Sequence, residues 1–228
     1  MSMSHDAAKN AAGLRALDFV KDGMKIGLGT GSTTAFFIHH LIKKCKKGMK
    51  IQAVATSLTT EKMARKGKIP MLDVNEVTSL DLTVDGADEI DPQKRLIKGA
   101  GGALIREKII AHMSQEMVVI ADESKLVPKL GIQPLPVEVN PFGGMATKKQ
   151  IEDLGFRTSW RKNKDGSQYV TDNQNWILDL VFEKPLDNPE ALHAILIENP
   201  GVIETGFFFN YATRIVIGKE GGTVTIIN

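Results

Sequence analysis

The chain has 228 residues, of which 42% are hydrophobic, so it can bury a sizeable core as one large domain or two unequal ones. Its 29 basic and 27 acidic residues leave a formal charge of +2, too small to indicate a nucleic-acid or membrane surface. A single cysteine, Cys45, excludes an intrachain disulfide. We find no apolar signal segment and no stretch near the ~18 apolar residues of a membrane span, so we expect a cytoplasmic protein.

Helices and strands alternate along the first half of the chain. Apolar residues at helical spacing predict helices over 7–20, 33–42, 57–66 and 103–113. Short apolar or alternating runs predict strands at 25–29, 50–56, 69–72, 80–84, 95–98 and 116–121. This alternation predicts an α/β fold with a doubly wound, mostly parallel, Rossmann-like sheet.

The second half changes character. Three prolines and a Gly-Gly pair between 134 and 144 interrupt any long element. The rest of this half has a βαββαβ pattern, with elements at 135–139, 147–154, 158–161, 169–171, 176–182, 189–197 and from 202 onward. We therefore expect a smaller α+β, ferredoxin-like domain over 131–205, inserted before the C-terminal strand of a larger domain formed by 1–130 plus 206–228. Residues 206–210 and 214–218 are predicted to return to the first sheet.

Three glycine-bearing segments punctuate the larger domain: Gly27–Thr33, Asp85–Glu89 and Lys98–Lys108. Each comes after an apolar, strand-like run. In an α/β fold all three would lie at one edge of the sheet, where such folds build their sites.

The first of these segments places Ser32 and Thr33 at the start of a helix, where free N–H groups and the helix dipole favour an anion. A dinucleotide fingerprint does not fit, because its third glycine position holds Thr34 and no acid is found about 20 residues further on. It is not a Walker loop either, because it lacks the Gly-Lys-Ser/Thr sequence. A plain helix cap remains the alternative.

Carboxylates and a lysine occupy the other two segments. Asp85 and Asp88 come just past a strand and are placed to point into a cleft, although a solvated acidic turn or a divalent-ion loop remains an alternative. Lys98 closes the next strand, and the glycines after it let the backbone approach a ligand closely. Glu107 lies about one turn into the next helix, where the alternative is an exposed acid in an ion pair.

At these residues the chain resembles the ribose 5-phosphate isomerase type A family over nearly its whole length. The segments that carry the resemblance are Gly27–Thr33, Asp85–Ile90, Lys98–Ile109, Ala121–Lys125 and Leu135–Val139. One departure is Ala100, where the family usually has glycine, so the backbone angles of that loop are expected to differ slightly. The segment from Gly206 resembles the family pattern only loosely.

The resemblance implies an aldose-ketose isomerase that interconverts D-ribose 5-phosphate and D-ribulose 5-phosphate through an enediolate. It implies no cofactor, and a homodimer or homotetramer with the smaller domain at the oligomer interface. The phosphate would lie against Thr30, Gly31, Ser32 and Thr33, with Lys125 and Lys9 neutralising its charge. The expected substrate-binding set also includes Asp85, Gly86, Ala87, Asp88, Lys98, Gly99, Ala100 and Gly101.

The same resemblance assigns the catalytic roles. Asp85 would help to open the furanose ring and move protons between the C1 and C2 oxygens, with Asp88 alongside. Glu107 would be the general base that carries a proton between C1 and C2. Lys98 and the N–H groups of the loop would stabilise the enediolate.

Two other classes of protein remain. A CoA transferase would use Glu107 as a covalent nucleophile, but its pantetheine arm needs a longer channel than these short loops suggest. A non-catalytic phosphosugar sensor would carry a helix-turn-helix, and about 20 residues before the first strand leave no room for one. The five histidines form no HxH or HExxH pattern, so no dedicated metal site is expected.

Overall fold

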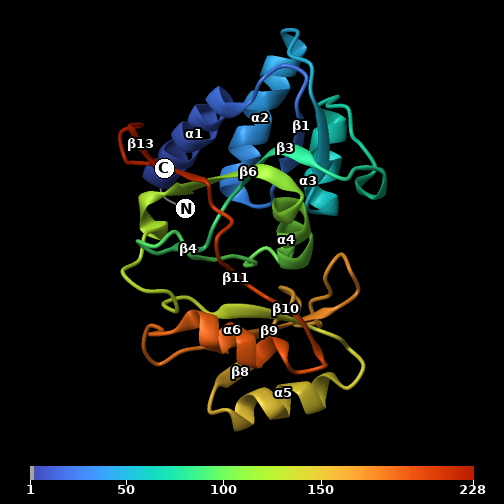
Figure 1. Ribbon diagram of the computed structural model, residues 1–228, viewed down its shortest axis with the longest axis vertical. Coiled ribbons are helices and arrows are strands. Elements are labelled where there is room, and N and C mark those ends of the chain that lie inside the picture. The colour runs from blue at the N-terminus through green and yellow to red at the C-terminus, as the bar shows by residue number, and fades with distance from the viewer. Residues whose placement is uncertain (1–2) are drawn as a thin grey trace. The chain divides into compact units, whose positions relative to one another are not determined.

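The computed structural model describes residues 3–228, and the chain divides into two compact units (Figure 1). The first comprises Met1–Ala87, Arg106–Lys125 and Asn210–Asn228, and the second comprises Asp88–Ile105 and Leu126–Phe209. The segment 88–105 therefore belongs to the second unit, whereas the predicted domain boundaries would leave it with the first.

A six-stranded sheet forms the centre of the first unit, in the order β13-β12-β6-β3-β1-β2. The strands are β1 (Lys25–Leu28), β2 (Gln52–Ala55), β3 (Leu80–Asp85), β6 (Ser114–Asp122), β12 (Arg214–Gly218) and β13 (Val224–Ile227). All neighbours are parallel except β13, which pairs antiparallel with β12. The prediction of a mostly parallel α/β sheet is confirmed.

Helices cover both faces of this sheet, as expected for a doubly wound fold. Helices α1 (Met3–Ala16), α2 (Ser32–Lys46) and α3 (Leu58–Lys66) contribute buried residues to one core, which also contains Ile26 and Leu28 of β1. Helix α4 (Leu104–His112) contributes Ile110 to a separate cluster with Val54 and Leu80. A Cβ on Gly27 would lie 2.5 Å from Cγ2 of Ile110, so the missing side chain lets α4 pack closely on β1.

Strand order determines where loops of this sheet converge. From β1 the chain moves to β2 on one side and then returns to β3 on the other. Such a reversal leaves a crevice beyond the carboxyl ends of the two central strands, the usual location of ligand sites in open α/β sheets. The loops after β1 and β3, which carry Gly29–Thr33 and Asp85–Gly86, lie at this position.

The second unit contains the predicted βαββαβ arrangement. Its elements are β7 (Leu135–Val139), α5 (Gly144–Asp153), β8 (Arg157–Trp160), β9 (Trp176–Val181), α6 (Pro189–Ile197) and β10 (Val202–Thr205). The four strands form an antiparallel sheet in the order β10-β7-β9-β8, and buried residues of α5 and α6 share one core with it. Helix α6 starts as its sequence dictates, because the Asn188 side chain accepts the Ala191 N–H and Pro189 occupies the first turn.

The C-terminal part of the second unit corrects one prediction. Residues 206–210 do not return to the first sheet. Instead β11 (Phe207–Phe208) pairs with β5 (Leu96–Ile97), which pairs with β4 (Glu89–Ile90) in a separate three-stranded sheet. An apolar run shows that a strand is buried but does not show which partner it takes.

Two predicted strands form only isolated bridges. Met71 bridges Ala53, and Val170 bridges Trp176, so neither 69–72 nor 169–171 becomes a strand. Within residues 3–228 we find no helix that combines the length and apolar character needed to cross a membrane.

Candidate active site

The loop after β1 ends in an uncapped helix start. Gly31 is the residue before α2, with a φ of 118° that favours glycine, and no side chain caps the helix. Ser32 and Thr33 begin the helix, as predicted. The first-turn N–H groups have no intrahelical acceptors, so this end of α2 is suited to bind an anion.

A cluster of hydroxyl groups holds the same loop from the side of β2. Thr30 Oγ1 lies 2.7 Å from Thr56 Oγ1 and 2.8 Å from Ser57 Oγ, and Thr60 Oγ1 donates to the Gly29 carbonyl at 2.9 Å. The Thr30 hydroxyl, predicted to meet the phosphate, is therefore engaged in this cluster. Thr56, Ser57 and Thr60 were not predicted for the site, although a run of hydroxyl residues directly after a strand could have indicated them.

Asp85 is buried at the end of β3 and tied to the loop after β1. Its Oδ1 accepts the N–H of Gly86 at 2.7 Å and that of Thr30 at 3.1 Å. The Gly29 N–H donates to the carbonyl of Val84 at 2.9 Å, which brings the two strand ends together. The alternative of a solvated acidic turn does not describe Asp85, because its side chain is inaccessible to solvent.

Glu107 is 4% exposed, so it is not the exposed helix acid that the sequence left as an alternative. It lies three residues before Ile110, on the face of α4 that packs against the sheet. Helix α4 leads into β6, which is parallel to β3, so the start of the helix lies at the carboxyl edge of the sheet. Glu107 and Asp85 are thus two buried carboxylates of the first unit at that edge.

A third buried carboxylate, Asp122, ends β6 and was not among the predicted site residues. It accepts hydrogen bonds from the Ser124 N–H and hydroxyl and lies 3.6 Å from Nδ1 of His5. Burial raises the pKa of Asp122, but the bonds from Ser124 and the charges of Lys125 and Lys9 outweigh it, so the pKa lies below its ordinary value. Lys9 is itself buried in α1, and Lys125 closes the 3₁₀ turn Glu123–Lys125. Both predicted phosphate lysines therefore act electrostatically on the same carboxylate.

The second unit holds Asp88, Lys98 and the glycine loop. The prediction that all three glycine-bearing segments follow strands of one parallel sheet is therefore wrong for the third, because Lys98 follows β5, which pairs antiparallel with β4 and β11. Asp88 Oδ2 accepts the Ala100 N–H at 2.9 Å, and the Asp88 N–H donates to the Ile97 carbonyl at 2.8 Å. Lys98 is 2% exposed, and its Nζ lies 5.3 Å from the centre of the Phe208 ring. Its backbone N–H donates to the carbonyl of Gly206, so the loosely matching segment from Gly206 supports this lysine.

The departure at Ala100 has a simple backbone explanation. Gly99 and Gly102 have φ values of 103° and 74°, which disfavour any other residue. Ala100 does not lie in this left-handed region. A methyl group at this position therefore requires no change in the backbone conformation of the loop.

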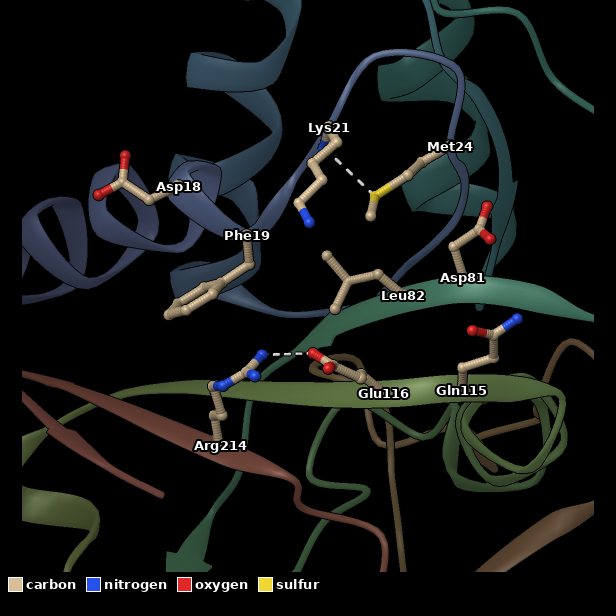
Figure 2. A pocket seen from close by; sticks show the side chains of 9 residues that line it. All are labelled: Asp18, Phe19, Lys21, Met24, Asp81, Leu82, Gln115, Glu116 and Arg214. Carbon is tan, nitrogen blue, oxygen red and sulfur yellow. Dashed lines mark hydrogen bonds and ion pairs between the residues drawn. The ribbon is translucent and has the colours of Figure 1, made fainter.

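The cavity drawn in Figure 2 lies away from these residues, at the amino ends of the parallel strands. It has a volume of about 420 Å³ and is lined by Asp18, Phe19, Lys21, Met24, Asp81, Leu82, Gln115, Glu116 and Arg214. Within it Arg214 forms an ion pair with Glu116, and Asp81 accepts the Lys25 N–H at 2.7 Å. None of the predicted site residues lines it. Elsewhere in the described chain, no three His, Cys, Asp or Glu side chains form a group suited to a metal ion.

The first unit thus has an α/β fold in which the carboxyl edge of the sheet carries an uncapped helix start and buried carboxylates. This combination is typical of α/β enzymes that act on anionic substrates. The family model for ribose 5-phosphate isomerase A (phosphoriboisomerase A) matches residues 52–222. The chain belongs to this family.

Similarity to individual members extends over nearly the whole chain. A ribose-5-phosphate isomerase A from Protochlamydia amoebophila is 50% identical over 96% of this chain and 95% of its own, and one from Bacillus mycoides is 48% identical over 94% and 96%. Among solved structures, a D-ribose-5-phosphate isomerase in complex with phospho-erythronic acid has a TM-score of 0.94 at 38% identity, covering 99% of this chain and 100% of its own. The Plasmodium falciparum ribose 5-phosphate isomerase has a TM-score of 0.94 at 35% identity, covering 98% of both chains.

Proposed function

We propose that this protein interconverts D-ribose 5-phosphate and D-ribulose 5-phosphate through an enediolate, without a cofactor or a metal ion. The observation that carries the proposal is the direct hydrogen bonding between the buried Asp85 carboxylate and the loop that opens α2. This hydrogen bond places an anion site, at the start of α2, directly beside a proton-transfer group, the carboxylate of Asp85. Membership of the family supports the choice of substrate.

The phosphate group of the substrate binds at the start of α2. The N–H groups in the first turn of α2, which begins at Ser32 and Thr33, have no intrahelical acceptor, and the dipole adds about half a positive charge there. Lys125 and Lys9 add two full positive charges, and Asp122 removes one of them. The net charge of about +1 leaves the pair attractive to a phosphate dianion.

Asp85 and Glu107 divide the proton transfers. Asp85 moves protons between the ring oxygen and the C1 and C2 oxygens, and Glu107 takes the C2 proton and returns it to C1. Such general acid-base catalysis contributes about 10²- to 10⁴-fold. Burial of both carboxylates supports these roles, because it keeps bulk water away from the groups that transfer the protons.

Lys98 and the loop after it supply positive charge and N–H donors for the enediolate oxygens. A well-placed donor of this kind contributes on the order of 3 kcal/mol to the transition state. Asp88 has a second role besides its expected part in proton transfer. Its carboxylate accepts the Ala100 N–H, so it helps to position the glycine loop. Remote phosphate binding then holds the sugar in register for the transfer.

The deciding experiment monitors the conversion of ribose 5-phosphate to ribulose 5-phosphate by NMR in heavy water, with and without EDTA. A carboxylate base exchanges the abstracted proton with solvent, so we expect deuterium at C1 of the product and full activity with EDTA. Binding of ribose 5-phosphate without turnover would identify a sensor, and turnover that requires a divalent ion without deuterium uptake would identify a metal-assisted hydride shift. Transfer of CoA between acids would identify the transferase.

A homodimer or homotetramer working in the cytoplasm completes the proposal. Exposed apolar side chains on the second unit support an interface there, because Phe142 is 90% and Met145 is 68% accessible and both lie near the start of α5. Light scattering is expected to give at least twice the mass of one chain. A monomeric mass at micromolar concentration would contradict this part of the proposal.

A further inference from the structure

Side chains of the β8–β9 hairpin hold the glycine loop of the second unit by its carbonyl groups. Nη1 of Arg161 donates to the carbonyl of Gly99 at 2.8 Å and to that of Ala100 at 3.0 Å. The hydroxyl of Tyr169 donates to the carbonyl of Gly101 at 3.1 Å. Three consecutive peptide units are therefore fixed by two side chains that lie more than 60 residues further along the chain.

Arg161 is itself held rigidly. Its Nε donates to Asp179 Oδ2 at 2.9 Å, and its Nη2 forms a second bond to Oδ1 of the same carboxylate, so the guanidinium is gripped in a bidentate pair. Its guanidinium carbon also lies 5.9 Å from the centre of the Tyr169 ring. With its Nε and Nη2 bound to Asp179, the guanidinium uses Nη1 to contact the loop. We call Arg161, Tyr169 and Asp179 the loop clamp.

Tyr169 reaches the loop only because Gly102 has no side chain. A Cβ on Gly102 would lie 2.2 Å from Oη of Tyr169. Burial raises the pKa of Tyr169, with the acids Asp172 and Glu138 adding to the rise and Arg161 opposing it, so the hydroxyl keeps the proton it donates. The clamp and the glycine pattern of the loop therefore depend on each other.

Fixing the carbonyl groups also fixes the N–H groups. Because a trans peptide is planar, its N–H points opposite to its C=O, so each clamped carbonyl sets the direction of the next N–H. The Ala100 N–H donates to Asp88 and the Gly102 N–H donates to the carbonyl of Gly99. Among residues 3–228, the Gly101 N–H has no partner, and it points away from the Ala100 carbonyl that Arg161 holds.

We propose that Arg161 is a positioning residue of the isomerase, which with Tyr169 and Asp179 aims the Gly101 N–H at the negative oxygen that develops on the enediolate. This inference rests on the proposed function, because it gives a direction to one of the loop donors assigned there. Arg161 does not touch the reacting atoms. It acts by preventing the Ala100–Gly101 peptide from rotating, so that the donor is in place before charge develops.

The test compares Arg161→Lys with the wild-type enzyme. A lysine cannot grip Asp179 with two donors and reach two carbonyls in the same plane, so the peptide regains freedom. We expect kcat to fall by about 10-fold or more while KM for ribose 5-phosphate changes less than about threefold, because the donor acts mainly on the transition state. Arg157→Lys is the matched control, because Arg157 lies on the adjoining strand β8, is largely exposed and pairs only loosely with Glu183.

Two inhibitors separate positioning from a general loss of structure. Phospho-erythronic acid carries a carboxylate in place of the enediolate oxygens, whereas ribitol 5-phosphate has neutral hydroxyl groups there. Arg161→Lys is expected to weaken the first about as much as it lowers kcat/KM and to leave the second nearly unchanged. Tyr169→Phe keeps the ring beside Arg161 and removes one bond, so we expect the same selectivity with a smaller effect, about threefold.

The outcomes distinguish this inference from the proposed function. A wild-type protein that does not turn over ribose 5-phosphate contradicts both. An active wild type whose Arg161→Lys variant keeps kcat, or loses affinity equally for both inhibitors, overturns the clamp alone. If Arg161→Lys does not fold, the selectivity of Tyr169→Phe decides, and equal inhibition constants in that variant and the wild type overturn the inference.

Discussion

Gly29→Ala is the most direct test of the link between β1 and Asp85. The new methyl carbon would lie 2.0 Å from Asp85 Oδ1, 2.2 Å from its Cγ and 2.6 Å from its Cα. Rotating the carboxylate cannot relieve the last of these contacts, because the Cα belongs to the main chain. The ends of β1 and β3 must therefore separate, which breaks the bond from the Thr30 N–H to Asp85.

Two terms set the size of the effect. Overpacking costs about 1–3 kcal/mol, and a lost hydrogen bond to a charged group costs about 1.5–3 kcal/mol. We therefore expect a loss of about 3 kcal/mol in the free energy of unfolding, which is about 6–12 °C in Tm for a chain of this size. Because Asp85 moves with the strand, kcat should also fall by about 10²-fold.

The assay pairs thermal unfolding by circular dichroism with isomerase kinetics. Gly86→Ala is the control for stability, because its Cβ would meet nothing closer than 3.8 Å and its φ is not positive. It should unfold within about 1 kcal/mol of the wild type, or above it, since alanine lowers the entropy of the unfolded chain. Equal Tm and kcat in Gly29→Ala and the wild type would refute the reasoning.

Three further predictions concern charged residues of the first unit. Glu107→Gln should lower kcat at least about 10²-fold with KM nearly unchanged, because an amide keeps the shape but cannot accept the carbon-bound proton; near-normal turnover would remove Glu107 as the base. Lys125→Ala should raise KM for ribose 5-phosphate, and free ribose should be a very poor substrate; comparable kcat/KM for the two sugars would contradict the phosphate site. Asp122 has a lowered pKa, so its stabilisation is present at neutral pH and is lost as pH falls through the folded-state value. Asp122→Asn should therefore be less stable than the wild type at pH 7, with a difference in urea midpoint that shrinks as the pH falls through the folded-state pKa of Asp122; a difference independent of pH would contradict the role of this charge.

Part of the candidate site could be predicted because its signals are local. Apolar runs that end in Gly29 and Asp85 indicate strand ends from neighbouring residues alone, and parallel strands bring these two ends to one side of a sheet. The same reasoning is wrong for Lys98, because it follows β5 in the separate antiparallel sheet. The position of Glu107 could be inferred from its distance to the start of a predicted helix. Its burial could not, because burial depends on how α4 packs against Gly27.

The contacts that could not be predicted from the sequence span long separations. Thr56 meets Thr30 over 26 residues, and Arg161 meets the carbonyl of Gly99 over 62. No periodicity indicates such pairs, because their partners are chosen by the tertiary fold. For the same reason, the sequence does not show that 207–208 pairs with β5 instead of the first sheet, or that 169–171 forms only an isolated bridge.

The chain passes from one compact unit to the other after Ala87, Ile105, Lys125 and Phe209. Each passage lies within or beside a segment that carries Asp85 and Asp88, the glycine loop, Lys125 or Phe208. No single cut of the gene can therefore separate the two units. A recombination event that exchanged 88–209 as one block would also replace residues 106–125 of the first unit, with Glu107 and Lys125. This architecture therefore favours inheritance of the two units together over their exchange one at a time.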